Sequence, residues 1–174
     1  GVNSNDLANK NNQLENLIKN IDFFKVFNEI EKNEIIKHLK VFEYKVGQSI
    51  SNEKIIQNKI FITLEGTARL LSTNKNNLDT IAKLGPGSVI GLGSLLRNSP
   101  CEKVTASTIL KTLVISDELI IKAYKTNKQF QKSCDISINP CEILALSQII
   151  LERSNRSDLD IKSIFYNLYK NSKL

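Results

Sequence analysis

Apolar side chains recur at helical spacing over the first forty residues. In the first of two such segments they stand three and four positions apart, on one face of a helix: Leu14, Leu17, Ile18 and Ile21. The second segment should end near Lys40, and its apolar residues are Ile30, Ile35, Ile36 and Leu39. Asn28 and Glu31 stand in front of it with the spacing of a capping pair. We therefore predict N-terminal helices in residues 1–40.

The pattern changes at Val41. Short runs rich in Val, Ile, Phe and Thr are now broken by Gly, Asn and Pro, which is typical of an all-β sandwich or roll. Turns are expected at Gly47, at Gly66 and in residues 85–87, because Gly tolerates a positive φ and Pro fixes its own φ. About eight strands fit between residues 41 and 115, so we predict a β-roll there.

Helical signals return in residues 116–174. Ser116 is the expected N-cap of one helix that continues through LIIKAYKTNKQFQ. The residues Asn139, Pro140 and Glu142 combine a cap, a proline at the first helical position and an acid in the first turn. The helix that they open, through EILALSQIILE, is apolar on nearly every side, so it is either buried or waiting for a partner.

A last helix should open at Ser157 and Asp160. Its apolar residues fall on one face: Ile161, Ile164, Phe165 and Leu168. The C-terminal helices together suit a docking segment or a dimer interface.

Composition narrows the classes of function. The net charge of +6 comes mostly from Lys residues scattered singly, which indicates a solvated surface rather than a nucleic-acid site. No apolar run is long enough to span a bilayer and the N-terminus has no signal-peptide core, so we expect a cytoplasmic segment without membrane insertion. The three cysteines have no metal or redox spacing and are expected as free thiols: Cys101, Cys134 and Cys141.

Three glycine motifs stand in order within this pattern. EYKVGQSI is similar to a Y-x-x-G-x-x-I entry, KIFITLEGTARLL to a Y-x-I-x-x-G hairpin, and AKLGPGSVIG to an L-x-x-G-x-x-F-G approach. Over roughly residues 22–134 the chain resembles the cyclic nucleotide-binding domains of catabolite-activator-type regulators, kinase regulatory subunits and some channels. The resemblance implies a mainly β fold: an eight-stranded β-roll (a double-stranded β-helix or jelly roll) with helices on both sides.

The resemblance also implies a ligand cassette in IGLGSLLRNSPCEKVTAS. In the family this segment reads approximately F-G-E-L-A-L and then P-R-A-A, where the acid holds the ribose and the arginine clamps the cyclic phosphate. Leu92 stands where the acid belongs and Cys101 where the arginine belongs, and a shift of one residue brings Glu102, which would repel phosphate. The candidate ligand-binding residues of this degenerate cassette are Gly91, Leu92, Gly93, Ser94, Leu95, Arg97, Cys101, Glu102 and Lys103.

Weak or absent binding of cAMP and cGMP is therefore expected in the usual pose. Arg97 or Lys103 could supply a displaced positive charge, or both could be exposed loop cations. A small anion held by backbone amides, such as 2-oxoglutarate, stays open as a ligand. No cofactor is otherwise implied.

No catalytic constellation accompanies the cassette. His38 is the only histidine and is expected on a surface, although a Cys–His pair stays open. Asp158 and Asp160 fit a helix start better than a metal site. We therefore expect a regulatory or sensory domain rather than an enzyme.

The expected partner is the remainder of a larger chain or a second protein, and a homodimer stays open. A helical extension of this kind resembles that of some ABC-type peptide exporters. The alternatives are the sensing part of a Crp/Fnr-type transcription regulator and a structural interaction domain with an empty pocket. Residues after Asp135 offer two helices and no strand pair for a winged helix, so no nucleic-acid contact is expected from this segment.

Overall fold

The fold is known from a computed structural model that describes residues 4–52, 54–74, 77–100, 102–136 and 140–172. Eight antiparallel strands form two four-stranded sheets, ordered β1-β8-β3-β6 and β2-β7-β4-β5. The strands are β1 (Lys40–Tyr44), β2 (Ser49–Ser51), β3 (Lys59–Glu65), β4 (Ala68–Asn74), β5 (Asn77–Leu84), β6 (Val89–Ile90), β7 (Lys103–Ala106) and β8 (Leu110–Ser116). The predicted eight-stranded roll is thus confirmed.

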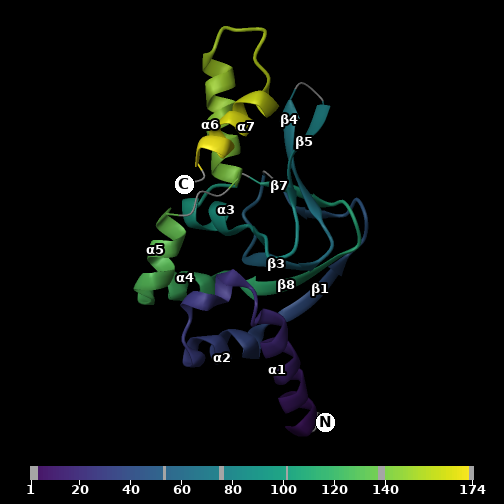
Figure 1. The fold of residues 1–174 in the computed structure, drawn as a ribbon, viewed down its shortest axis with the longest axis vertical. Helices are drawn as coiled ribbons and strands as arrows, with labels where there is room; N and C mark the ends of the chain where they lie inside the picture. Colours follow the sequence, from purple (N-terminus) through teal and green to yellow (C-terminus); the bar gives the residue numbers. More distant parts are fainter. Residues whose placement is uncertain (1–3, 53, 75–76, 101, 137–139, 173–174) are drawn as a thin grey trace.

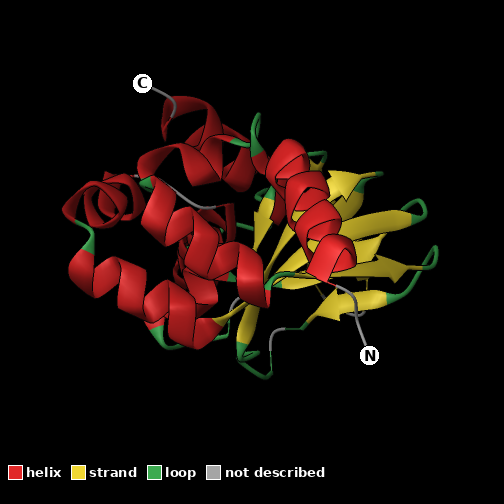
Figure 2. Ribbon diagram, turned by 90° about the horizontal axis from the view of Figure 1, so that it is seen from below, coloured by secondary structure: helices red, strands yellow, loops and turns green. Residues whose placement is uncertain are grey.

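Helices precede the roll, interrupt it once and follow it (Figure 1). They are α1 (Ser4–Ile18), the 3-10 helix η1 (Asp22–Val26), α2 (Glu29–His38), α3 (Leu92–Arg97), α4 (Asp117–Thr126), α5 (Lys128–Ile136), α6 (Pro140–Arg153) and α7 (Ile161–Ser172). Seen from below, most of the helices gather to one side of the sheets (Figure 2).

Strand β3 explains why the helices and the roll pack as one unit. Its central residues Ile60, Phe61 and Ile62 are all at most 1% exposed. Since successive strand residues point to opposite faces, both faces of this strand must be covered. Ile60 and Ile62 belong to the hydrophobic cluster formed with the N-terminal helices and α4–α5. Phe61 belongs to a second cluster inside the roll, which also contains residues of α6 and α7.

The first cluster depends on aromatic side chains from both ends of the chain. Phe23 makes edge contacts with Phe24 and with Phe130, at ring-centroid distances of 5.2 and 5.6 Å. Phe27 lies 5.0 Å from Phe130. These contacts hold η1 against α5, more than a hundred residues further along the chain.

The predicted helix starts and ends can now be compared with the structure. The capping box before α2 is present: Asn28 accepts from Glu31 N–H, and Glu31 accepts from Asn28 N–H. Ser116 precedes α4, but its side chain makes no capping bond; instead Asp117 Oδ1 accepts from Glu118 N–H. The last helix begins at Ile161, so the prediction that Ser157 opens it was wrong.

The cap of α7 is Asp160, which accepts from the backbone N–H and the hydroxyl of Ser163. These bonds hold the pKa of Asp160 below its ordinary value. Helix α6 begins at Pro140 as predicted, whereas the expected cap Asn139 lies outside the described residues. The first helix ends at Ile18, before Ile21, and Leu17 is 41% exposed, so its apolar face is narrower than predicted.

The predicted single helix after Ser116 is wrong, because Asn127 divides it into α4 and α5. The Asn127 amide nitrogen donates to Val26 O at 3.2 Å and to both Glu31 carboxyl oxygens at 3.0 and 3.1 Å. Its amide oxygen accepts from Phe130 N–H at 2.9 Å, as an N-cap does. Asn127 therefore starts α5 and ties it to the N-terminal helices at once.

We expect Asn127→Ala to lower the free energy of unfolding by about 2 kcal/mol, because it removes a helix cap and a donor to two partly buried acceptors. Asn127→Asp keeps the cap but places a second carboxyl against Glu31, so it should be destabilising as well. Urea unfolding measures both. Thr126→Ala, at the adjacent exposed position, is the matched control and should stay within about 0.5 kcal/mol. An unchanged midpoint for both Asn127 variants would contradict the bridging role.

The α6–α7 hairpin packs against the roll from the opposite end to α1 (Figure 1). Ile143, Leu144, Ile161 and Phe165 are each at most 4% exposed and share the second cluster with Leu70, Val104 and Ala106. Helix α7 contacts β5 and helix α6 contacts α3. The hairpin is thus in direct contact with the one helix that interrupts the roll.

Candidate functional site

The candidate site begins at Gly91, between β6 and α3. Its φ is +96°, a left-handed conformation that L side chains rarely adopt. A Cβ here would also lie 3.4 Å from Lys59 O on the neighbouring strand. This position therefore suits glycine.

The Gly91 N–H is already bonded, and its acceptor is the side chain of Glu102. The amide nitrogen lies 3.0 Å from Glu102 Oε2 and 3.2 Å from Oε1. The hydroxyl of Ser94, one turn into α3, donates to Oε1 at 3.3 Å. Glu102 is only 3% exposed and Ser94 only 7%. A buried carboxyl is thus held by donors from the turn and from α3.

The backbone around Glu102 fixes this orientation. The Glu102 carbonyl accepts from Ser51 Oγ at 3.3 Å, and β7 begins at the next residue and pairs with both β2 and β4. Burying a carboxyl is costly unless hydrogen bonds compensate, so the bonds from Gly91 and Ser94 stabilise this arrangement. Glu102, an acid that lies in the predicted cassette, is therefore the acceptor shared by Gly91 and Ser94.

The other expected cassette residues lie in different surroundings. Leu92 and Leu95 pack against the first hydrophobic cluster, which anchors α3 on the core of the protein. Gly93 is buried. Arg97 is exposed at the last position of α3, at the other end of that helix from Gly91.

Lys103 is half-buried in β7, opposite Leu71 of β4. Cys101 lies outside the described residues. The structure therefore brings Gly91, Ser94 and Glu102 together and leaves Arg97 apart from them. The sequence drew attention to Glu102 but gave no direct signal that its carboxyl turns inward.

Solved structures with the same arrangement of strands and helices exist at low sequence identity. The regulatory subunit of a cAMP-independent protein kinase A from Trypanosoma brucei matches at 18% identity, a TM-score of 0.69, 82% of this chain and 52% of that one. The Trypanosoma cruzi regulatory subunit, bound to guanosine, matches at 18% identity and a TM-score of 0.67, over 83% of this chain and 51% of that one. The sensor domain of the transcriptional regulator DNR from Pseudomonas aeruginosa matches at 8% identity and a TM-score of 0.63, over 86% and 98%.

This chain has the cyclic nucleotide-binding domain fold. It spans about half the length of the two kinase regulatory subunits. No protein-family model matches the sequence, and no curated protein does. At these identities the likeness establishes the fold alone, so the chemistry of the site depends on the residues described above.

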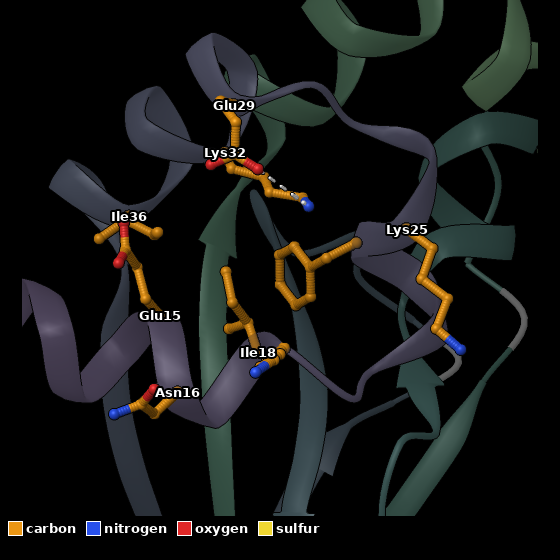
Figure 3. A pocket seen from close by; sticks show the side chains of 9 residues that line it. Glu15, Asn16, Ile18, Lys25, Glu29, Lys32 and Ile36 are labelled. Carbon is orange, nitrogen blue, oxygen red and sulfur yellow. Dashed lines mark ion pairs between the residues drawn. The ribbon is translucent and has the colours of Figure 1, made fainter.

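In this cyclic nucleotide-binding fold a hollow lies outside the roll, between α1, η1 and α2 (Figure 3). Its volume is about 310 Å³, and Ile18, Phe24 and Ile36 contribute its apolar part. Two of its lysines are already paired: Lys32 Nζ lies 3.6 Å from Glu29, and Lys25 Nζ lies 2.6 Å from Asp22. These pairs are solvent-exposed and weak. We therefore place the candidate site in the cassette.

The remaining reactive side chains stay apart from the cassette of this fold. Cys134 is a half-buried free thiol in α5, and burial together with the nearby Asp135 carboxyl raises its pKa to about 11. His38 is exposed at the end of α2. Among the described residues, no three His, Cys, Asp or Glu side chains lie close enough to share a metal ion. No helix in the described ranges is both long and apolar enough to cross a membrane.

Proposed function

We propose that this chain is a regulatory domain whose cassette is closed by its own Glu102 side chain instead of by the phosphate of a cyclic nucleotide. The observation that carries the proposal is the pair of bonds from Gly91 N–H and Ser94 Oγ to the buried carboxyl. In cyclic nucleotide-binding domains, backbone donors of this turn serve the phosphate. Here one of these backbone donors, Gly91 N–H, is bonded to the Glu102 carboxyl of the same chain.

A cyclic phosphate would have to displace the Glu102 carboxyl before it could take the same donor. Hydrogen bonds to charged groups contribute on the order of 1.5–3 kcal/mol, and losing them corresponds to about tenfold to hundredfold in affinity. An ionised carboxyl would also repel the phosphate if it stayed. Small dianions such as 2-oxoglutarate would likewise have to displace the Glu102 carboxyl and would be repelled by it if it stayed ionised.

The transmitted signal would reach the rest of a larger protein through α3 and α6. These two helices are in contact, and α3 carries Ser94, one of the donors to Glu102. A change at the cassette would therefore change how α6 and α7 dock. An ABC-type exporter is one parent with such a helical extension, and a Crp/Fnr-type regulator is the second; the reading frame after Leu174 separates them.

A neutral nucleoside is a second candidate ligand, favoured by a specific observation. The related Trypanosoma cruzi regulatory subunit was solved with guanosine, which has ribose hydroxyls but no phosphate. Hydroxyl groups can donate to a carboxyl, so a nucleoside would be compatible with Glu102 where a nucleotide is not. In this case the domain would be a nucleoside sensor.

Isothermal titration calorimetry with cAMP, cGMP, guanosine and 2-oxoglutarate tests the proposal. We expect no measurable heat from either cyclic nucleotide, and binding of guanosine alone would select the nucleoside sensor. A thermal shift provides the control, since a ligand at a hundred times its Kd stabilises by about 2.7 kcal/mol. A micromolar Kd for cAMP or cGMP would overturn the closed-cassette proposal.

A further inference from the structure

Helix α6 leaves an apolar stripe uncovered. Its inner face carries Ile143, Leu144 and the fully buried Ser147, which pack toward the roll. On the outer face Leu146 is 48% exposed and Ile149 is 45% exposed. Large apolar side chains grouped on one helix face in this way indicate contact with another surface.

Opposite charges mark the two ends of the same stripe. Glu142 precedes Leu146 by four residues, and Arg153 follows Ile149 by four. Eleven residues make about three turns of a helix, so Glu142 and Arg153 lie on the same face as the two apolar residues. Neither makes an ion pair with another residue in the described part of the chain.

The spacings along this stripe are four, three and four, which is the same sequence of spacings when read backwards. In an antiparallel pair of identical helices, each Leu146 would therefore face Ile149 of the other copy. Each Glu142 would face Arg153 of the other copy. A parallel pair would instead bring like charges together, which is unfavourable.

We propose that this stripe, Glu142, Leu146, Ile149 and Arg153, binds a second copy of this chain in an antiparallel, two-fold symmetric contact. Two-fold interfaces are self-complementary, with residue i of one copy on residue j of the other and the reverse. The stripe meets that condition in both its apolar and its charged positions. Ile150, 37% exposed beside it, widens the apolar contact.

One pair of fourteen-residue helices buries less area than stable dimers usually do. The dimer should therefore be weak and visible only as a concentration dependence. A Kd of roughly 10–100 µM is expected for a contact at the small end of protein interfaces. This inference does not depend on the cassette or on its ligand.

Sedimentation velocity of the 174-residue chain between roughly 1 and 500 µM tests the proposal over the range in which contacts of this strength are populated. We expect the wild type to change from monomer to dimer. Glu142→Arg and Arg153→Glu should each weaken self-association by about tenfold, because each places like charges together at both ends of the contact. Leu146→Asp should abolish it.

Mixing the two single charge variants gives the decisive result. At one end of a mixed pair, the arginine introduced by Glu142→Arg faces the glutamate introduced by Arg153→Glu. At the other end the unchanged Arg153 of the first variant faces the unchanged Glu142 of the second, so association should return to the wild-type level on mixing. A role confined to the fold of one chain cannot be rescued by a second chain. Ile30→Asp, a change at an 82% exposed residue of α2, is the control and should leave association unchanged.

Circular dichroism shows which variants are folded, and the surface charge variants keep the test valid if Leu146→Asp unfolds. A wild type that stays monomeric over the whole concentration range would overturn the proposal. So would single charge variants that associate as well as the wild type.

Discussion

A Cys101→Arg, Glu102→Ala double variant is expected to bind cAMP, whereas the wild-type chain is not. Alanine at 102 removes the carboxyl that occupies Gly91 N–H and Ser94 Oγ. Arginine at 101 restores the P-R-A pattern that the family uses after the cassette turn, and its planar guanidinium can clamp a phosphate with two bonds. The two changes together should raise affinity by at least about a hundredfold, since each acts on the same phosphate position.

Leu92 is left unchanged in our design, because it packs against the hydrophobic cluster and an acid there would destabilise α3.

Calorimetry with cAMP measures the effect, and Glu102→Gln is the matched control. Glutamine has nearly the same shape and keeps an amide oxygen for Gly91 N–H, but it cannot carry a negative charge. The glutamine is therefore placed beside the same Cys101→Arg change: if occupancy of the donor matters most, Cys101→Arg, Glu102→Gln should still bind cAMP poorly, and if the negative charge matters most, it should bind as well as the alanine double variant. If the double variant folds and still takes up no cyclic nucleotide, the cassette is not the site and the proposal is lost.

The roll was predictable because its signals are local. Glycines at positive φ mark its turns, and short runs of β-branched residues mark its strands. The capping box of Asn28 and Glu31 was equally local, since both partners lie within four residues. Patterns of this kind need no knowledge of distant contacts.

The division between α4 and α5 could not be predicted in the same way. Asn127 lies in a segment with helical periodicity, and the bonds that hold it reach back to Val26 and Glu31, about a hundred residues away. The inward turn of Glu102 has a similar cause. Its partners Gly91 and Ser94 are near in sequence, but only the fold of the roll buries them together. The sequence therefore named Gly91, Ser94 and Glu102 as candidates but did not predict that the structure buries them together.

Gly66 should be the least replaceable of the turn glycines. Its φ is +87°, and a Cβ built on it would overlap Ile109 O and lie 2.7 Å from Thr108 Oγ1. The two turns that contain Gly66 and Ile109 are held close together by a hydrogen bond, since Thr67 N–H donates to Thr108 Oγ1 at 2.9 Å. A methyl group would therefore both strain the backbone and push the two turns apart.

We expect Gly66→Ala to lower the free energy of unfolding by more than about 3 kcal/mol, by adding a backbone clash to an unfavourable φ. Gly47→Ala is the matched control, since Gly47 has nearly the same φ, +82°, but no atom within 4 Å of its missing Cβ. That variant should lose only about 1–2 kcal/mol, the cost of a left-handed L residue. Urea unfolding of both proteins separates the free-energy cost of the left-handed backbone, which both variants share, from the cost of the steric clash, which only Gly66→Ala has. Equal losses would mean that the close approach of Gly66 to Ile109 does not constrain the roll.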